Sequence, residues 1–384
     1  MKKRISIFGS TGSIGINALA VVDHLSDQFK IVILTANRQW ETLVQQTIKY
    51  RPETICLVDE THADKVRDAL SHLDIEIVFG RDGLLELASR KNTDLMLNAL
   101  VGSAGMEPTF RAVTAGVDVA LSNKESLVMA GSIITKAASE NNAKIFPVDS
   151  EHSAIWQCLV GESMEDMRRI ILTGSGGPFR NRELSTFDKI QPEEALKHPS
   201  WDMGNKITID SATMMNKGLE VIEAHWLFDL HSDKIDIVVH PQSVIHSMVE
   251  FNDSSVKAQL GVPDMKVPIQ YALTYPSHVE ASWKRLDLIE MGTLTFEKPD
   301  FQRFPCIKLA FDVLKTGGTA AAVLNVANDH AVDLFLKHKI RFTDIPRILE
   351  AAVDKHMYIA NPSLEDLLII EKWTSDMINN GELI

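Results

Sequence analysis

The sequence predicts an α/β protein whose first 150 residues form a doubly wound parallel sheet. Short apolar runs recur through this part of the chain, and helix-length amphipathic segments such as residues 13–24 and 126–141 lie between most of them. Such alternation of strand and helix gives parallel strands joined by crossover helices. The expected strands are residues 5–8, 31–35, 54–58, 75–79, 95–97, 117–121 and 144–148. Because small and polar residues follow these runs, we expect ligands beyond the carboxyl ends of the strands.

The pattern changes after about residue 150. A strand at 170–172 is followed by three more, and their short connections predict an antiparallel sheet, which makes this part α+β. The three strands are residues 235–240, 244–251 and 256–260. His240 and His246 belong to this region, where we expect structural roles for them. The later helical periodicity predicts a small C-terminal helical bundle at residues 307–315, 319–337, 344–357 and 363–380.

These patterns divide the chain into four parts. We expect a Rossmann-like domain at 1–150, a catalytic and connective domain at 151–275, an extended linker at 276–299 and a helical domain at 300–384. Residues 178–205 lack clean periodicity and are rich in Arg, Pro and Trp. Long segments of this kind often act as lids, and a surface connection anchored by Trp201 is the alternative.

Composition places the chain among soluble globular proteins of two or three domains, with 384 residues, 45% hydrophobic and 24% charged. The formal charge of −13 argues against nucleic acid or an anionic membrane as the main partner. The three cysteines have no paired spacing, which excludes a disulfide framework and indicates a reducing compartment. No secretory apolar core follows the basic start, and no apolar run approaches about 18 residues, so we expect a cytoplasmic protein.

The first candidate site is the glycine loop GSTGSIG at residues 9–15, between the first expected strand and helix. Glycines allow a tight turn, and the free N–H groups of the helix start can bind a pyrophosphate. The second strand ends at Ala36, Asn37 and Arg38, where an NAD-specific site would carry an acid. Since Arg38 offers a cation for a 2′-phosphate, NADPH is favoured. A plain tight turn with an exposed arginine is the alternative.

The second candidate site is the pair Asp149 and Glu151, which directly follows the strand expected at 144–148. In an extended segment, side chains two residues apart point the same way, so both carboxylates would face one side. Two like charges so close favour a cation between them, and a hard divalent ion takes oxygen ligands. A solvated turn is the alternative. Lys124 begins an expected helix, where a cation opposes the helix dipole; we expect it to meet a substrate oxygen or the nicotinamide.

Two later stretches also group polar residues. The glycine-serine turn TGSGGP at residues 173–178 exposes backbone N–H groups and the Ser175 hydroxyl, which suits an anion. On an expected helix, an acid, an amide and a cation share one face, just after a serine. These residues are Ser211, Asn216, Lys217 and Glu220. They suit a metal and a phosphorylated polyol, and a surface salt bridge is the alternative.

Taken in order, these motifs closely resemble the 1-deoxy-D-xylulose 5-phosphate reductoisomerase family over essentially the whole chain. They are GSTGSIG at 9–15, SNKES at 122–126, PVDSEH at 147–152, TGSGGPF at 173–179, HPSWDMG at 198–204, DSATMMNKGLE at 210–220 and HPQSVIHSMV at 240–249. The resemblance implies that an NADPH- and metal-dependent enzyme rearranges and reduces 1-deoxy-D-xylulose 5-phosphate to 2-C-methyl-D-erythritol 4-phosphate. It implies a place in the non-mevalonate (MEP) pathway to isoprenoid precursors, and a homodimer.

The resemblance also implies roles for individual residues. A divalent metal (Mg²⁺, Mn²⁺ or Co²⁺) is expected at Asp149, Glu151 and Glu220. Substrate contacts are expected from Lys124, Ser150, Glu151, Ser175, His198, Trp201, Met203, Ser211, Asn216, Lys217 and Glu220. Within this set, the phosphate is expected at Ser175, His198, Ser211, Asn216 and Lys217. NADPH contacts are expected from Thr11, Gly12, Ser13, Ile14, Ala36, Asn37, Arg38, Asn123, Glu125 and Gly204, although the family's details vary at 36–38.

Two other functions fit parts of the sequence. A semialdehyde or homoserine-type dehydrogenase shares the glycine loop before an α/β core. The semialdehyde type needs a nucleophilic cysteine in a polar loop, whereas Cys158 lies in an apolar segment. A catalytically inactive binding or regulatory protein on the same fold is the second alternative, and the intact acids with Lys124 and Lys217 count against it. Metal-dependent NADPH oxidation on adding the sugar phosphate would separate the three functions.

Overall fold

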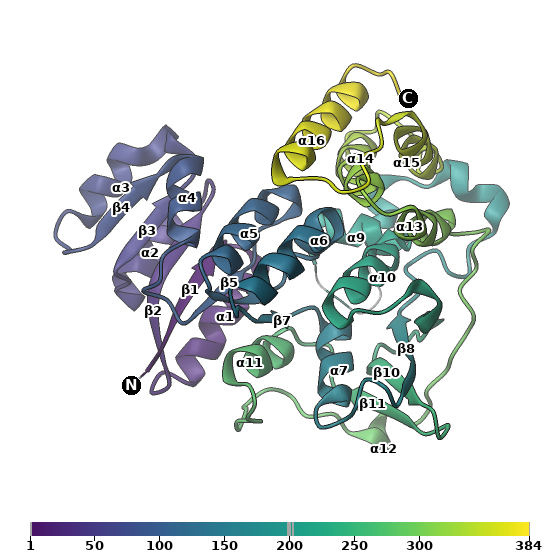
Figure 1. The fold of residues 1–384 in the computed structure, drawn as a ribbon, viewed down its shortest axis with the longest axis horizontal. Coiled ribbons are helices and arrows are strands. Elements are labelled where there is room, and N and C mark those ends of the chain that lie inside the picture. The colour runs from purple at the N-terminus through teal and green to yellow at the C-terminus, as the bar shows by residue number, and fades with distance from the viewer. Residues whose placement is uncertain (1, 198–200, 202, 384) are drawn as a thin grey trace. The chain divides into compact units, whose positions relative to one another are not determined.

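The computed structural model describes residues 2–197, 201 and 203–383, and the chain divides into two compact units (Figure 1). Unit 1 comprises the chain up to Ser126, with Ser132–Ser153 and Asp264–Trp283. Unit 2 comprises Leu127–Gly131, Ala154–Pro263 and the chain from Lys284 onward. The chain therefore crosses between the units several times.

Unit 1 is built on a seven-stranded parallel sheet with the strand order β4-β3-β2-β1-β5-β6-β7. The strands are β1 (Lys3–Phe8), β2 (Phe29–Ala36), β3 (Thr54–Leu57), β4 (Glu76–Phe79), β5 (Leu95–Asn98), β6 (Asp118–Leu121) and β7 (Ile145–Pro147). The predicted doubly wound sheet is confirmed. Strands such as β3 and β5 are buried at every position, which explains their continuous apolar runs.

The helices of unit 1 follow the strands in the order that a doubly wound sheet requires. They are α1 (Ser13–His24), α2 (Trp40–Tyr50), α3 (Ala63–Leu70), α4 (Gly80–Ala88), α5 (Met106–Thr114) and α11 (Lys266–Thr274), with 3₁₀ turns η1 (Glu60–His62) and η2 (Gly102–Gly105). Right-handed crossovers place α1, α2 and α3 on one face and α4 and α5 on the other. Because β1 lies between β2 and β5, the loops after β1 and β5 meet at the topological switch point.

Two helices begin in unit 1 directly after the last two strands of the sheet. They are α6 (Lys124–Glu140) and α7 (Ser150–Leu159). The start of α7 corrects one expectation. Asp149 and Glu151 do not lie in an extended segment, because Asp149 precedes α7 and accepts a hydrogen bond from the Glu151 backbone N–H (3.1 Å). The aspartate thus caps a helix.

Unit 2 contains a four-stranded mixed sheet with the order β11-β10-β8-β9. Its strands are β8 (Met167–Gly174), β9 (Ile235–Val239), β10 (Ile245–Phe251) and β11 (Val256–Leu260). The expectation of three successive antiparallel strands is wrong in one respect. Strand β8 lies between β9 and β10, and it pairs parallel with β9 and antiparallel with β10. The C-terminal residues of β8 and β9 therefore meet at one edge of this sheet.

Helices form the rest of unit 2, and the predicted C-terminal helices are confirmed. The helices are α9 (Asn205–Ala212), α10 (Met215–Phe228), α13 (Pro305–Thr316), α14 (Ala320–Leu336), α15 (Asp344–Lys355) and α16 (Leu364–Asn379), with the short α8 (Pro192–Ala195) and α12 (Leu288–Met291) and the 3₁₀ turns η3 (Leu184–Lys189) and η4 (Ser232–Lys234). Helix α10 packs against α13, and α14 packs against α15 and α16. A buried apolar cluster that includes Ile170, Val221 and Val249 joins α10 to the sheet.

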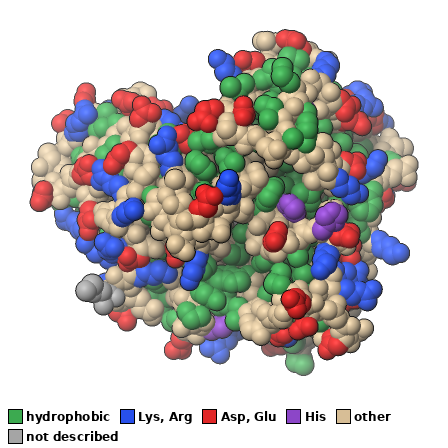
Figure 2. All heavy atoms as spheres, in the orientation of Figure 1, with side chains coloured by type: hydrophobic (Ala, Val, Ile, Leu, Met, Phe, Trp, Pro, Cys, Tyr) green, Lys and Arg blue, Asp and Glu red, His purple; other side chains and the backbone are tan. Residues whose placement is uncertain are grey.

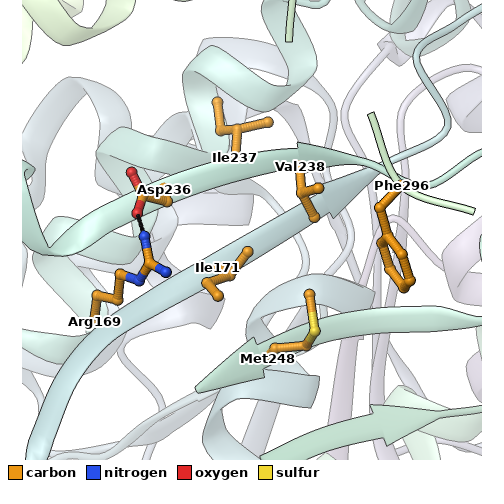
Figure 3. Close-up of a pocket in the computed structure, with 7 residues that line it drawn as sticks. All are labelled: Arg169, Ile171, Asp236, Ile237, Val238, Met248 and Phe296. Atoms are coloured by element: carbon orange, nitrogen blue, oxygen red, sulfur yellow. Dashed lines mark hydrogen bonds and ion pairs between the residues drawn. The ribbon is translucent and has the colours of Figure 1, made fainter. Parts of the chain in front are cut away.

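One face of the mixed sheet carries an open hollow of about 420 Å³ (Figure 3). Its lining is Arg169, Ile171, Asp236, Ile237, Val238, Met248 and Phe296. None of the residues predicted to bind ligands belongs to it. Nearby, His240 is buried, its ring stacks on Phe296 (5.0 Å between centroids), and its Nδ1 hydrogen-bonds the Thr295 carbonyl (2.9 Å). The expected structural role of His240 is consistent with these contacts.

The surface of the molecule mixes acidic and basic side chains on the face shown in Figure 2. Exposed ion pairs among the described residues include Arg4 with Asp94 (2.8 Å) and Lys30 with Glu53 (2.7 Å). Exposed pairs of this kind contribute little to stability. Among the described residues, no helix combines the length and the apolar character needed to cross a membrane.

Candidate active site

Helix α1 begins at Ser13, within the glycine-rich sequence at residues 9–15. Gly12 is the N-cap of α1, in extended conformation, and no side chain caps the first turn. Close packing explains Gly15, since a Cβ there would lie 2.4 Å from the Gly9 carbonyl oxygen. Ser10 is buried and donates to Gln46 Oε1 (2.6 Å), which fixes the loop. The Gly12 N–H donates to the Gly9 carbonyl (3.1 Å), and the first turn of α1, which begins at the exposed Ser13, therefore offers the N–H groups that bind a phosphate.

The residues predicted to select the cofactor follow strand β2. Ala36 is buried at the strand end, while the Arg38 side chain is 82% exposed. Its guanidinium lies 3.3 Å from an Asp59 carboxylate oxygen, and Asp59 N–H donates to the Asn37 carbonyl (2.9 Å). Asp59 was not predicted, because it follows β3 rather than β2. The exposed Arg38, in the loop after β2, can therefore reach a phosphate group of a bound cofactor.

Asn123 lies at the start of α6 and joins two loops at the switch point. Its Oδ1 accepts from the Ser126 backbone N–H (3.1 Å), and its Nδ2 donates to the carbonyls of Leu100 (3.0 Å) and Gly102 (2.9 Å). Nδ2 also lies 3.1 Å from Glu125 Oε2. Asn123 therefore holds together the loops that follow β5 and β6, and it places Glu125 beside them.

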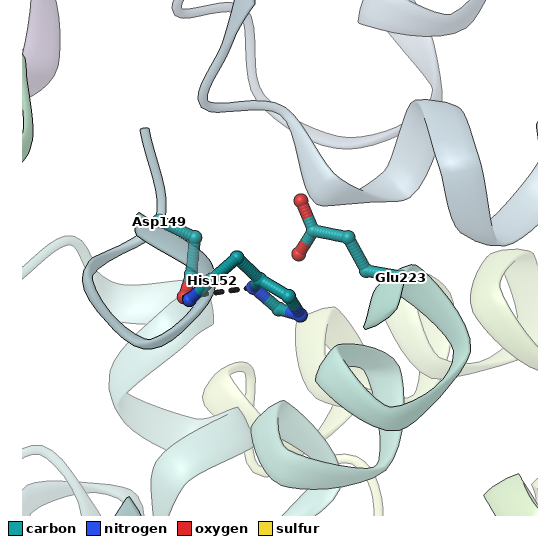
Figure 4. Close-up of side chains that lie close together, drawn as sticks. All are labelled: Asp149, His152 and Glu223. Atoms are coloured by element: carbon teal, nitrogen blue, oxygen red, sulfur yellow. Dashed lines mark hydrogen bonds and ion pairs between the residues drawn. The ribbon is translucent and has the colours of Figure 1, made fainter. Parts of the chain in front are cut away.

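Lys124 and Asp149 form a nearly buried ion pair in unit 1. The Lys124 Nζ and Asp149 Oδ2 are 2.6 Å apart, and the two side chains are only 7% and 10% exposed. Ser150 Oγ donates to Glu151 Oε2 (2.5 Å). Figure 4 shows His152 beside Asp149: its Nδ1 lies 3.1 Å from Asp149 Oδ1. The structure thus brings the predicted residues Lys124, Asp149, Ser150 and Glu151 together, and it adds His152.

Helix α10 of unit 2 carries the third predicted acid with two polar neighbours. Asn216 Nδ2 donates to Glu220 Oε1 (2.5 Å), and Lys217 Nζ donates to Glu220 Oε2 (2.5 Å). Lys217 and Glu220 are 4% and 0% exposed. The simpler prediction of a surface salt bridge is therefore wrong. Ionised groups at this depth are seldom kept without a function or strong pairing.

The Ser175 turn lies against the same part of unit 2. The aliphatic chain of Lys217 passes 3.1 Å from the position of a Cβ on Gly174. Gly177 has φ +68°, and a Cβ there would lie 2.6 Å from the Ser211 carbonyl oxygen. The turn and the end of α9 are thus in direct contact. Ser175, Ser211, Asn216 and Lys217, which were predicted to hold a phosphate, belong to one neighbourhood of unit 2.

The predicted lid, residues 178–205, is partly anchored. Phe179 and Phe187 are buried, and both rings pack edge-to-face against Phe342 (5.4 and 6.0 Å between centroids). Further along, the Trp201 ring lies 6.3 Å from His246. Gly204 is the N-cap of α9, and its carbonyl, like that of Met203 beside it, accepts from Thr208 Oγ1 (2.9 and 3.5 Å). His198 was also predicted to contact the substrate, but it lies outside the described residues.

Cys158 is unsuited to the nucleophile that a semialdehyde dehydrogenase needs. It lies inside α7, 7% exposed, and burial raises the pKa of its thiol to about 11. Reactive cysteines have lowered pKa values and polar surroundings. The structure therefore gives no support to that alternative.

The fold and the site residues define the class of protein. A glycine loop at the first strand–helix junction of a doubly wound sheet is typical of dinucleotide-dependent enzymes, and buried acids with lysines indicate bound cations and anions.

The comparisons with known proteins specify the family. Family models described as the 1-deoxy-D-xylulose 5-phosphate reductoisomerase, its C-terminal domain and the DXP reductoisomerase C-terminal domain match residues 5–131, 145–228 and 260–377. The chain belongs to the 1-deoxy-D-xylulose 5-phosphate reductoisomerase family.

Relatives and solved structures agree with this assignment over nearly the full length. The reductoisomerase of Chloroherpeton thalassium is 52% identical over 97% of this chain and 96% of its own, and that of Chlorobaculum tepidum is 50% identical over 97% and 98%. The Zymomonas mobilis enzyme in complex with NADPH has a TM-score of 0.92 and 41% identity, covering 98% of each chain. A DOX-P reductoisomerase with NADPH, fosmidomycin and magnesium has a TM-score of 0.94 and 38% identity, covering 99% and 98%.

Proposed function

We propose that this chain converts 1-deoxy-D-xylulose 5-phosphate to 2-C-methyl-D-erythritol 4-phosphate, using NADPH and a divalent metal, in the MEP pathway. The observation that carries the proposal is the family membership, combined with the buried Lys217 and Glu220 of α10 and the pair of buried Lys124, at the start of α6, with Asp149. Relatives at about half identity bear the reductoisomerase name, and solved relatives hold NADPH and magnesium.

The donor set fits a hard divalent ion. Asp149, Glu151 and Glu220 each offer a carboxylate oxygen, and Mg²⁺ and Mn²⁺ prefer oxygen ligands. We propose that these three acids hold one ion together. When bound, such an ion supplies Lewis-acid polarisation of a substrate oxygen. The carboxylates of Asp149 and Glu220 are each contacted by a lysine, Lys124 and Lys217, which counters the charge of the acids.

Substrate binding is proposed at the polar residues that the sequence analysis singled out. Ser175, Ser211, Asn216 and Lys217 would hold the phosphate, with His198. A lysine and serine hydroxyls suit a phosphate because they provide a positive charge and hydrogen-bond donors. Lys124 and Ser150 would donate to substrate oxygens, and Trp201 and Met203 would cover the carbon chain and exclude water.

The cofactor is proposed to lie across the switch point of unit 1. Thr11, Gly12, Ser13 and Ile14 would bind the pyrophosphate through the backbone at the α1 start. Arg38 would pair with the 2′-phosphate, with Ala36 and Asn37 beside it. Asn123, Glu125 and Gly204 would contact the rest of the cofactor. When bound, NADPH would supply the hydride that the reduction requires.

We further propose a homodimer in the cytoplasm. The mixed sheet of unit 2 supports the dimer, since the hollow in Figure 3 is lined by apolar side chains beside the Arg169–Asp236 ion pair. Phe296 in its lining and Val256 on β11 are 47% and 51% exposed. Sedimentation of the purified chain would test this proposal, and a Val256→Arg variant should shift the equilibrium toward monomers.

The function is tested by following NADPH absorbance after adding 1-deoxy-D-xylulose 5-phosphate. We expect oxidation that requires Mg²⁺ or Mn²⁺ and stops with EDTA. Glu220→Gln should abolish turnover while NADPH binding, measured by fluorescence titration, stays close to that of the wild type. Metal-independent oxidation, or full turnover in the folded Glu220→Gln variant, would contradict the proposal.

A further inference from the structure

Asp149 has a different partner on each of its carboxylate oxygens. Oδ2 lies 2.6 Å from Lys124 Nζ. Oδ1 accepts from the backbone N–H of Glu151 (3.1 Å) and lies 3.1 Å from His152 Nδ1. The His152 side chain is 0% exposed. Oδ1 is therefore held by residues at the start of α7, and Oδ2 faces Lys124.

The protonation of His152 follows from its partner. An ionised carboxylate can only accept a hydrogen bond, so the ring nitrogen that faces Asp149 Oδ1 must carry the proton. Nδ1 is thus the donor. Side-chain rotation of an aspartate would exchange its two oxygens, and the bonds to Oδ1 from Glu151 and His152 oppose that exchange.

Backbone capping alone would leave the carboxylate less constrained. The Glu151 N–H belongs to the backbone of the first turn of α7, whereas the imidazole belongs to a side chain three residues after Asp149. The His152 backbone N–H also lies 3.5 Å from Oδ1, so the imidazole adds a side-chain donor to two backbone donors on this oxygen and further limits rotation of the carboxylate. The second oxygen, Oδ2, then has one orientation.

We propose that His152 is a positioning residue, which orients Asp149 so that Oδ2 is presented to the divalent ion. The proposal rests on the proposed function, in which Asp149 is a metal ligand. Partners that hydrogen-bond a ligating carboxylate typically change metal affinity by about 10- to 100-fold when they are removed. His152 belongs to this class by its contact, and the sequence analysis assigned it no role.

The test compares three variants of the full chain by Mn²⁺ titration, with free Mn²⁺ followed by electron paramagnetic resonance. Asn places an amide N–H where His has Nδ1, so His152→Asn keeps the bond to Asp149. Gln reaches the position of Nε2 instead, so His152→Gln loses the bond at similar size, and His152→Ala removes it. His330→Gln serves as a control, because His330 is a partly buried histidine of unit 2 that bonds Ser375 (2.9 Å).

We expect His152→Asn and His330→Gln to bind Mn²⁺ nearly as the wild type does. His152→Gln and His152→Ala should bind it about 10- to 100-fold more weakly. Thermal melting tests whether each variant folds. If His152→Ala does not fold, the Mn²⁺ affinities of His152→Asn and His152→Gln decide whether His152 positions Asp149. Equal affinity of Asn and Gln variants overturns the inference. If Asp149→Asn leaves Mn²⁺ binding unchanged, the proposed metal site itself fails, which is a separate result.

Discussion

Gly177→Ala tests whether the Ser175 turn and the end of α9 form one anion site. Gly177 has φ +68°, and a Cβ would lie 2.6 Å from the carbonyl oxygen of Ser211. A left-handed conformation costs a residue with a Cβ about 1–2 kcal/mol. The contact is with backbone, which moves less readily than a side chain, and overpacking of this kind adds about 1–3 kcal/mol.

Gly161→Ala provides the matched control. Gly161 has φ +81°, but nothing lies within 4 Å of its added Cβ. The free energy of unfolding of Gly161→Ala should therefore fall only by the cost of the left-handed conformation, about 1–2 kcal/mol. That of Gly177→Ala should fall by about 2–5 kcal/mol, because overpacking adds to this cost. The reduced entropy of the unfolded chain affects both variants alike, so it cancels in the comparison.

Urea unfolding and steady-state kinetics measure the two effects. Because the added Cβ pushes the Ser175 turn away from Ser211, we expect the KM for the sugar phosphate to rise in Gly177→Ala and the KM for NADPH to stay constant. Gly161→Ala should change neither KM. Equal stability losses in the two variants, or an unchanged substrate KM in Gly177→Ala, would refute the packing argument.

Further predictions concern the cofactor, the thiols and pH. Arg38→Ala should raise the KM for NADPH about 10- to 100-fold and leave that for NADH unchanged, since a charge-assisted bond contributes about 1.5–3 kcal/mol; parallel changes would exclude Arg38 as the 2′-phosphate partner. Burial raises the pKa of Cys56 and Cys306 to about 12, so iodoacetamide at pH 8 should label neither until urea is added, as mass spectrometry would report. Burial lowers the pKa of His330 below its ordinary 6.5, so the unfolded chain binds the proton first and stability should fall as pH drops below about 6.5; His330→Gln should lose this part of the dependence in urea melts.

The parallel sheet could be predicted because inner strands such as β3 and β5 are buried on both faces and therefore appear as continuous apolar runs. Helix α1 was predicted at residues 13–24, exactly where it lies, because glycines precede it and its apolar positions recur with helical spacing. The pairing of the second sheet could not be predicted. Strand β8 lies between β9 and β10 in the sheet, although a long segment separates β8 from both of them in sequence. The local sequence pattern carries no information on such pairing.

The acids were predicted as a group, and their local geometry was not. Asp149 followed by Ser, Glu and His is also typical of a helix start, but the sequence analysis predicted an extended segment there. His152 follows from the helix start, since the third residue of a helix returns to its cap. The aromatic anchor of the 178–205 segment was missed for another reason: Phe342, which packs on Phe179 and Phe187, is far away in the chain.

The most direct test of the central claim is anomalous diffraction from crystals of the chain grown with Mn²⁺. The account predicts one strong Mn²⁺ peak with oxygens of Asp149, Glu151 and Glu220 all within ligand distance, about 2.0–2.3 Å. An Mn²⁺ peak at another place would contradict the account. So would a peak near Asp149 and Glu151 with Glu220 beyond ligand distance.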